Sequence, residues 1–125
     1  MTTDQLSPQI VMHTLERFSG ELEQKSSWLN EVERMLEVTE AEYTKFVDEF
    51  EVGLLLKSES SEYKLPSEAL RVKLARTKMD PQLLGRYEGL VRKRRRLEQR
   101  IRDIKVQIDA QRSLLSALKV LEEVR

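Results

Sequence analysis

The stretch 83–118, LLGRYEGLVRKRRRLEQRIRDIKVQIDAQRSLLSAL, places most of its apolar residues alternately four and three positions apart. A heptad pattern of this kind lines one face of an α-helix with side chains that pack against another helix. Asp80 and Pro81 precede the stretch as a cap and a first helical residue. We therefore predict a helix over about 80–123. Its seam consists of Leu83, Tyr87, Leu90, Arg94, Leu97, Ile101, Ile104, Ile108, Gln111, Leu115 and Leu118.

The first half of the chain repeats this pattern over a similar length. Ser7 and Pro8 supply the cap and the first helical residue, so we predict a helix over about 8–56. Only Lys25, Thr39 and Gly53 interrupt the apolar spacing. The seam consists of Val11, Leu15, Phe18, Leu22, Lys25, Leu29, Val32, Leu36, Thr39, Tyr43, Phe46, Phe50 and Gly53.

A polar connector joins the two seams. The serine-rich stretch 57–64, KSESSEYK, predicts a loop, and Pro66, Ser67 and Glu68 open a short helix over about 66–78. The alternative is a β-hairpin formed by 51–56 and 63–65. No domain boundary is visible, so we predict a single helical domain over 1–125.

Opposite charges on the two halves indicate how the helices pair. Residues 1–62 contain 14 acidic and 5 basic residues, whereas residues 63–125 contain 8 acidic and 17 basic residues, and the chain sums to zero. Acidic positions flank the first seam and basic positions flank the last, which favours pairing of the first helix with the last. The predicted fold is all-α, an antiparallel, coiled-coil-like long helical hairpin with a short connecting helix. The flanking residues are Glu21, Glu33, Glu40, Glu42, Glu49, Arg86, Lys93, Arg100, Lys105, Arg112 and Lys119.

A register follows if Phe50 lies level with Leu83: Glu49 then approaches Arg86, and Glu42 approaches Lys93. Further apolar side chains lie beside or outside the seams, which indicates packing either against the connector helix or between chains, and of these we predict a homo-oligomer. They are Met12, Trp28, Met35, Val47, Val91, Val106, Leu114, Val120 and Leu121.

Residues suited to catalysis are scarce. The chain has no cysteine and one histidine, His13, and its acids follow ordinary helix spacing rather than metal-ligand spacing. No glycine-rich loop is available to hold a phosphate. We expect no enzyme activity, no metal and no cofactor. The start of the chain, MTTD, does not resemble a signal peptide, and we expect no membrane association and a cytoplasmic protein.

Basic residues form the strongest candidate site. The run 92–96, RKRRR, lies in the last helix, and more bases lie in the connector. Arginines without acidic partners are suited to binding phosphate, because guanidinium groups pair with two oxygens at once. The alternatives are a solvated face with ion pairs to the acidic helix, or a nuclear localisation signal. The candidate nucleic-acid-binding residues are Arg71, Lys73, Arg76, Lys78, Arg92, Arg95, Arg96 and Arg102.

The layout resembles a known family. It combines a helix with Trp28-Leu29 and Glu42-Tyr43, a basic middle, and the closing stretch 112–118, RSLLSAL. This plan is similar to that of bacteriophage recombination mediators of the UvsY type. The resemblance implies an oligomeric helical hairpin that binds single-stranded DNA and helps a recombinase displace single-strand-binding protein, in the host cytoplasm.

Two functions from different classes follow. The first is a non-enzymatic, oligomeric protein that binds the backbone of single-stranded DNA as an accessory factor in recombination or replication. The second is a structural, scaffolding or regulatory coiled-coil module whose charges only govern helix pairing. A prefoldin-like chaperone is a third interpretation, and it requires a β-hairpin in the connector.

Overall fold

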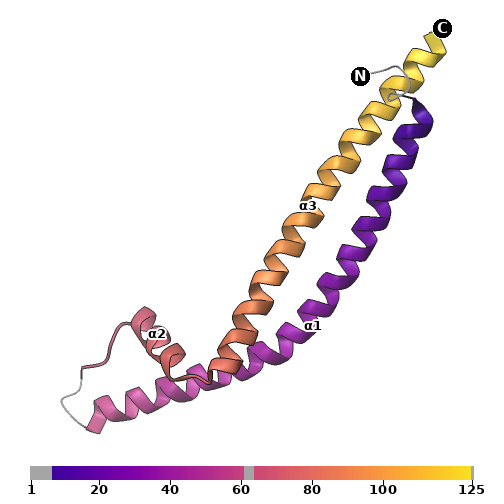
Figure 1. Ribbon diagram of the computed structural model, residues 1–125. Helices are drawn as coiled ribbons and strands as arrows, with labels where there is room; N and C mark the ends of the chain where they lie inside the picture. Colours follow the sequence, from indigo (N-terminus) through magenta and orange to yellow (C-terminus); the bar gives the residue numbers. More distant parts are fainter. Residues whose placement is uncertain (1–6, 61–63, 125) are drawn as a thin grey trace. The chain divides into compact units, whose positions relative to one another are not determined.

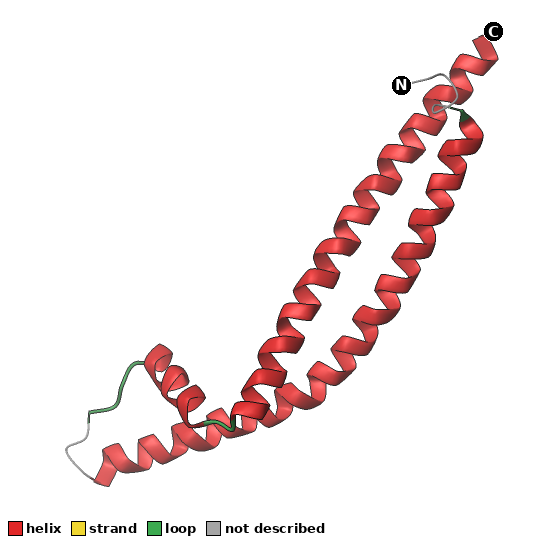
Figure 2. Ribbon diagram, in the orientation of Figure 1, coloured by secondary structure: helices red, strands yellow, loops and turns green. Residues whose placement is uncertain are grey.

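The computed structural model describes residues 7–60 and 64–124 and contains three helices in these ranges. They are α1 (Pro8–Ser60), α2 (Glu68–Lys78) and α3 (Pro81–Val124), and no strand occurs in the described part of the chain (Figures 1 and 2). Helix α1 packs against α3, so the predicted all-α helical hairpin with a short connecting helix is confirmed. No helix among these three has an apolar stretch long enough to cross a membrane.

Helix α1 begins at Pro8 as predicted, whereas α2 begins two residues and α3 one residue after the predicted starts at about 66 and 80. In each case an oxygen-bearing side chain precedes the helix and accepts a hydrogen bond from a backbone N–H of the first turn, which would otherwise lack a partner. Proline at the first position of α1 and α3 costs no hydrogen bond, because the backbone N–H that it lacks would have no partner inside the helix. The three bonds run from Ile10 N to Ser7 Oγ (3.4 Å), from Leu70 N to Ser67 Oγ (3.4 Å) and from Gln82 N to Asp80 Oδ1 (3.1 Å).

The end of α1 differs from the prediction. The helix continues through Ser60, so the first four residues of the predicted loop at 57–64 are helical, while residue 64 is not. Ser58 donates to the carbonyl oxygen of Leu55 at 2.8 Å, which satisfies its hydroxyl within the helix. No glycine or proline interrupts this stretch, so its polar composition alone does not end the helix. The β-hairpin alternative is wrong for 51–56, which are helical, and Tyr63 lies outside the described residues.

The chain forms two compact units, each made from parts of α1 and α3. The first unit contains residues 8–31 of α1 and 94–124 of α3. On α3 the stripe Leu97, Ile101, Ile104 and Ile108 is buried, and Ile104 is fully inaccessible. Arg100 contacts Glu21 on α1, with Nε 2.7 Å from Oε1. Aliphatic burial and a flanking ion pair therefore hold these two helix segments together, as the charge pattern predicts.

The second unit contains residues 32–60 of α1, all of α2 and residues 81–93 of α3. The rings of Tyr43 on α1 and Tyr87 on α3 stack with centroids 4.1 Å apart and an angle of 11° between their planes. Thr39, a polar member of the predicted seam, is buried, and its hydroxyl donates to the carbonyl oxygen of Met35 at 3.0 Å. Because that hydroxyl has a partner, its burial costs little.

The register within this unit corrects the prediction. Arg86 pairs with Glu42, at 3.9 Å between Nη2 and Oε2, rather than with Glu49. The expected placement was therefore wrong by one heptad at this ion pair. A seam that repeats every seven residues offers several registers of similar apolar match. In the observed register the rings of Tyr43 and Tyr87 stack against each other.

Replacing Ile104 with alanine should lower the free energy of unfolding by about 3 kcal/mol, because it opens a cavity in a fully buried stripe. The matched change Val52→Ala, at a side chain that is 53% exposed, should alter it by less than about 0.5 kcal/mol. Urea denaturation followed by circular dichroism measures both values. Equal effects of the two changes would show that Ile104 is not part of the stabilising core.

Candidate nucleic-acid interface

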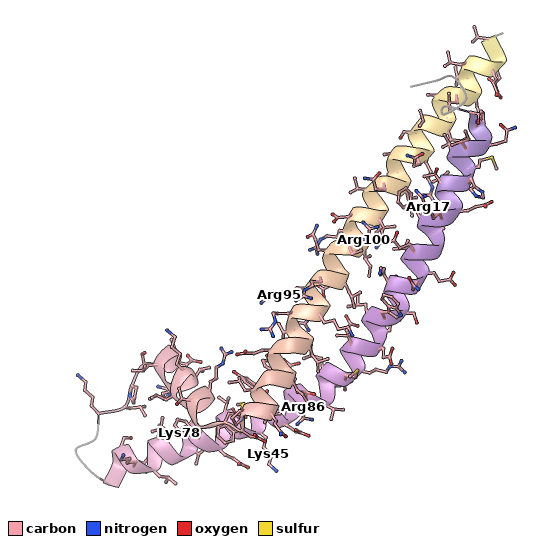
Figure 3. All side chains as sticks on the ribbon, in the orientation of Figure 1. Arg17, Lys45, Lys78, Arg86, Arg95 and Arg100 are labelled. Atoms are coloured by element: carbon pink, nitrogen blue, oxygen red, sulfur yellow. The ribbon has the colours of Figure 1, made fainter. Side chains whose placement is uncertain are left out.

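The eight predicted phosphate-binding residues lie on two helices. Arg71, Lys73, Arg76 and Lys78 lie on α2, and Arg92, Arg95, Arg96 and Arg102 lie on α3. Figure 3 shows Lys78 and Arg95 on these two helices among the other charged side chains. The contacts of the eight residues divide them into a structural group and a free group.

The two arginines of α2 have partners within their own unit. Arg71 donates from Nη1 to the carbonyl oxygen of Pro66 at 2.8 Å, and its Nε lies 3.9 Å from Oε1 of Glu51 on α1. Arg76 pairs with Glu88 on α3. Both guanidinium groups already contact a carboxylate, so they join α2 to the neighbouring helices rather than presenting a free charge. These pairs were not predictable from local sequence patterns, because the partners are 20 and 12 positions away.

The two lysines of α2 are different. Lys73 and Lys78 are exposed, and neither forms an ion pair with any acid in the described ranges. Lysine ammonium groups that are fully solvated attract an anion as point charges without fixing its orientation. They supply long-range attraction to a polyanion and little geometric specificity.

On α3, Arg92, Arg95 and Arg96 are exposed and have no ion pair with a described acid. Residues three and four apart are neighbours on a helix surface, so these three side chains form one cluster, which we call the arginine face. The helical repeat places this face opposite the buried stripe that contains Leu97 and Ile101. The arginine face therefore points away from the hairpin contact.

The remaining arginines of this region have local partners. Arg102 donates from Nη2 to Oε1 of Gln99 at 2.8 Å, and Gln99 donates in turn to Asp103 at 2.9 Å. Arg94, a predicted seam residue, is half-buried and lies 3.8 Å from Glu98. Arg102 therefore borders the arginine face with its guanidinium group hydrogen-bonded to a neutral amide, whereas Arg94 lies outside the face.

Aromatic side chains that could stack on bases are few. Tyr87 is occupied by its stack with Tyr43, and Tyr63 lies outside the described residues. Trp28 is an aromatic that sequence reasoning assigned to a core or an interface, yet it is 41% exposed. The ammonium of Lys25 lies 4.3 Å from its ring centroid. An exposed indole beside a cation is a combination that single-stranded nucleic acid can use, through stacking and phosphate attraction.

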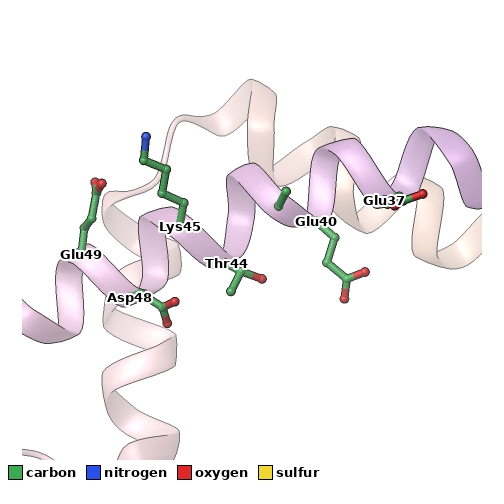
Figure 4. Close-up of a pocket in the computed structure, with 7 residues that line it drawn as sticks. Glu37, Glu40, Thr44, Lys45, Asp48 and Glu49 are labelled. Atoms are coloured by element: carbon green, nitrogen blue, oxygen red, sulfur yellow. The ribbon is translucent and has the colours of Figure 1, made fainter.

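A second region, on the outer surface of α1, is acidic and therefore unfavourable for binding phosphate. A shallow depression there is lined by Glu37, Glu40, Asp48 and Glu49, with Lys45 as its one base (Figure 4). All of these side chains come from a single helix.

The described residues contain no group of three or more His, Cys, Asp or Glu side chains placed to hold a metal ion. His13 is exposed, and its Nδ1 lies 3.9 Å from Oε2 of Glu16.

Comparisons of the chain with protein-family models, with curated proteins and with solved structures found no match. The function therefore has to be inferred from the residues and contacts described above.

The division of the arginines predicts different responses to charge reversal. Arg76→Glu places two carboxylates beside each other at Glu88, and we expect the free energy of unfolding to fall by about 1 kcal/mol or more. The matched reversal Arg95→Glu, at an exposed position without an ion pair to a described acid, should leave it within about 0.5 kcal/mol. Thermal unfolding of both variants at low salt tests this, and a larger loss in Arg95→Glu would contradict the assignment.

Proposed function

We propose that this protein is a non-enzymatic, self-associating helical hairpin that binds the backbone of single-stranded DNA through the arginine face of α3. The observation that carries the proposal is the exposure of Arg92, Arg95 and Arg96 without an ion pair to a described acid. Three adjacent guanidinium groups repel one another, and a row of phosphates relieves that repulsion while accepting bidentate hydrogen bonds.

The mode of binding follows from the side chains available. Lys73 and Lys78 add charge on α2, and Trp28 with Lys25 offers a stacking position on α1. With so few exposed aromatics, most of the affinity must come from phosphates, and such binding is largely independent of base sequence. The acidic depression on α1 repels the phosphates of single-stranded DNA, so the DNA is directed to the basic residues.

A biological role is proposed from the same features. A protein that holds single strands without reading their sequence is suited to an accessory function in recombination or replication, beside a recombinase or a single-strand-binding protein. The resemblance to the bacteriophage recombination mediators supports this role, as does the helical hairpin. We accordingly place the protein in the host cytoplasm.

A second candidate function is a coiled-coil adaptor that binds another protein. It is favoured by apolar side chains on α1 that remain exposed in the second unit, Met35 at 53% and Val38 at 65%. Such side chains are typical of an interaction surface. Under this alternative, the arginine face is solvated and contributes only to solubility.

Titration of a labelled single-stranded oligonucleotide separates the two functions. The variant Arg92→Ala/Arg95→Ala/Arg96→Ala should bind more weakly, and its dependence on salt should be less steep by about 0.7 per lost phosphate contact. The matched control removes three exposed bases from α1, with Arg17→Ala/Arg34→Ala/Lys45→Ala, so that net charge changes equally. Fluorescence anisotropy between about 50 and 200 mM salt gives both slopes.

A control variant that weakens as much as the arginine-face variant would indicate a diffuse charge effect and contradict the proposed site. No binding by the wild type at low salt would exclude DNA binding and leave the adaptor function.

A further inference from the structure

Helix α3 carries a second heptad stripe on the side away from α1. From Val106 onward, residues four and three positions apart are small or apolar, and all are exposed. Val106 is 65% exposed, Val120 57% and Val124 80%. We call this set the outer stripe, and its members are Val106, Ala110, Ser113, Ala117, Val120 and Val124.

A solvated helix surface does not have this composition. Exposed positions of a long helix are normally charged or polar, as they are at Arg92, Arg95 and Arg96 on the same side of α3. The outer stripe has no charge over about five turns, and Leu121, which is 61% exposed, widens it on one side. Regular heptad spacing identifies a helix as the partner, since the side chains of a helix fit into such a row.

The charges beside the stripe indicate which helix fits. Arg102 flanks it near its N-terminal end, and Glu123 flanks the same side at its C-terminal end. Arg102 at one end and Glu123 at the other come together when this surface is turned end for end against a second copy. In an antiparallel pair, Arg102 of each copy lies beside Glu123 of the other. In a parallel pair, Arg102 meets Gln107, and no opposite charges come together.

We propose that α3 of a second copy of this chain packs antiparallel on the outer stripe, with Arg102 beside Glu123 of the second copy. The same register places Val106 over Ala117 of the second copy and Ala110 over its Ser113. Each of these contacts includes alanine or serine, so the two helices can approach closely. The interface is two-fold symmetric, with the same surface used by both copies.

The dimer leaves the arginine face free. In this register Val124, the last described residue of the second copy's α3, lies level with Gln99, so the described part of that helix does not cover Arg95 or Arg96. The dimer has two arginine faces about 50 Å apart along the paired α3 helices, at 1.5 Å per residue. One strand that reaches both faces is held more tightly than a strand that reaches one, because the second contact is intramolecular. This consequence rests on the DNA binding in the proposed function, whereas the dimer itself does not.

Sedimentation of the full chain tests the interface. The wild type should be a dimer at high concentration, and Ala110→Glu/Ala117→Glu should weaken association by about 100-fold or more, because it buries like charges at the contact. Alanine and glutamate both have high helix propensity, so the helix content measured by circular dichroism should be unchanged. The matched control Ser27→Glu/Asn30→Glu adds the same charge to exposed positions of α1 and should leave the dimer intact.

Charge exchange tests the antiparallel register. Arg102→Glu and Glu123→Arg should each weaken the dimer, and the combined variant should restore it, because the opposite charges still meet. A monomeric wild type, a dimer that survives Ala110→Glu/Ala117→Glu, or a combined variant no better than the single ones overturns the proposal. A normal dimer that fails to bind DNA contradicts only the proposed function, so the two failures are distinguishable.

Discussion

The burial of one aliphatic stripe on α3 is the constraint on which the rest of the structure depends. Leu97, Ile101, Ile104 and Ile108 are buried, and Ile104 is fully inaccessible. A helix that turns four consecutive seam positions inward has little freedom in where its other residues point. The arginine face and the outer stripe are exposed because they occupy the opposite side of the same helix. The exposure of both surfaces is therefore a geometric consequence of the hairpin contact.

The charged side chains determine which helices pair and contribute little to the free energy of folding. The ion pairs Glu21–Arg100 and Glu42–Arg86 connect α1 with α3, each within its own unit, and each involves partly exposed side chains. Pairs of this kind contribute little free energy, so apolar burial stabilises the contact while charge decides which helices pair. The neutral total of 22 bases and 22 acids thus conceals a chain whose charges are separated into different surfaces.

The sequence predicted the elements of this fold well because long seams and capping residues are local signals. Ser7, Ser67 and Asp80 mark the helix starts through bonds to residues two or three positions away. The register of α1 against α3 in the second unit and the ion pairs of the α2 arginines were not predictable in this way, because they depend on contacts between residues distant in the sequence. Arg71 and Arg76 resemble free bases in the sequence, yet each finds a carboxylate on another helix. The exposed arginine face was predictable because the heptad spacing alone places it opposite the seam.

The distribution of aromatic residues gives each unit its own optical reporter. Trp28, the single tryptophan, lies in the first unit at the surface beside Lys25. Tyr43 and Tyr87 lie in contact in the second unit. Indole emission therefore senses the environment of the first unit, and the near-ultraviolet circular dichroism of the stacked phenols senses the packing of the second. The two parts of the hairpin can be observed separately in the native chain, without attached labels.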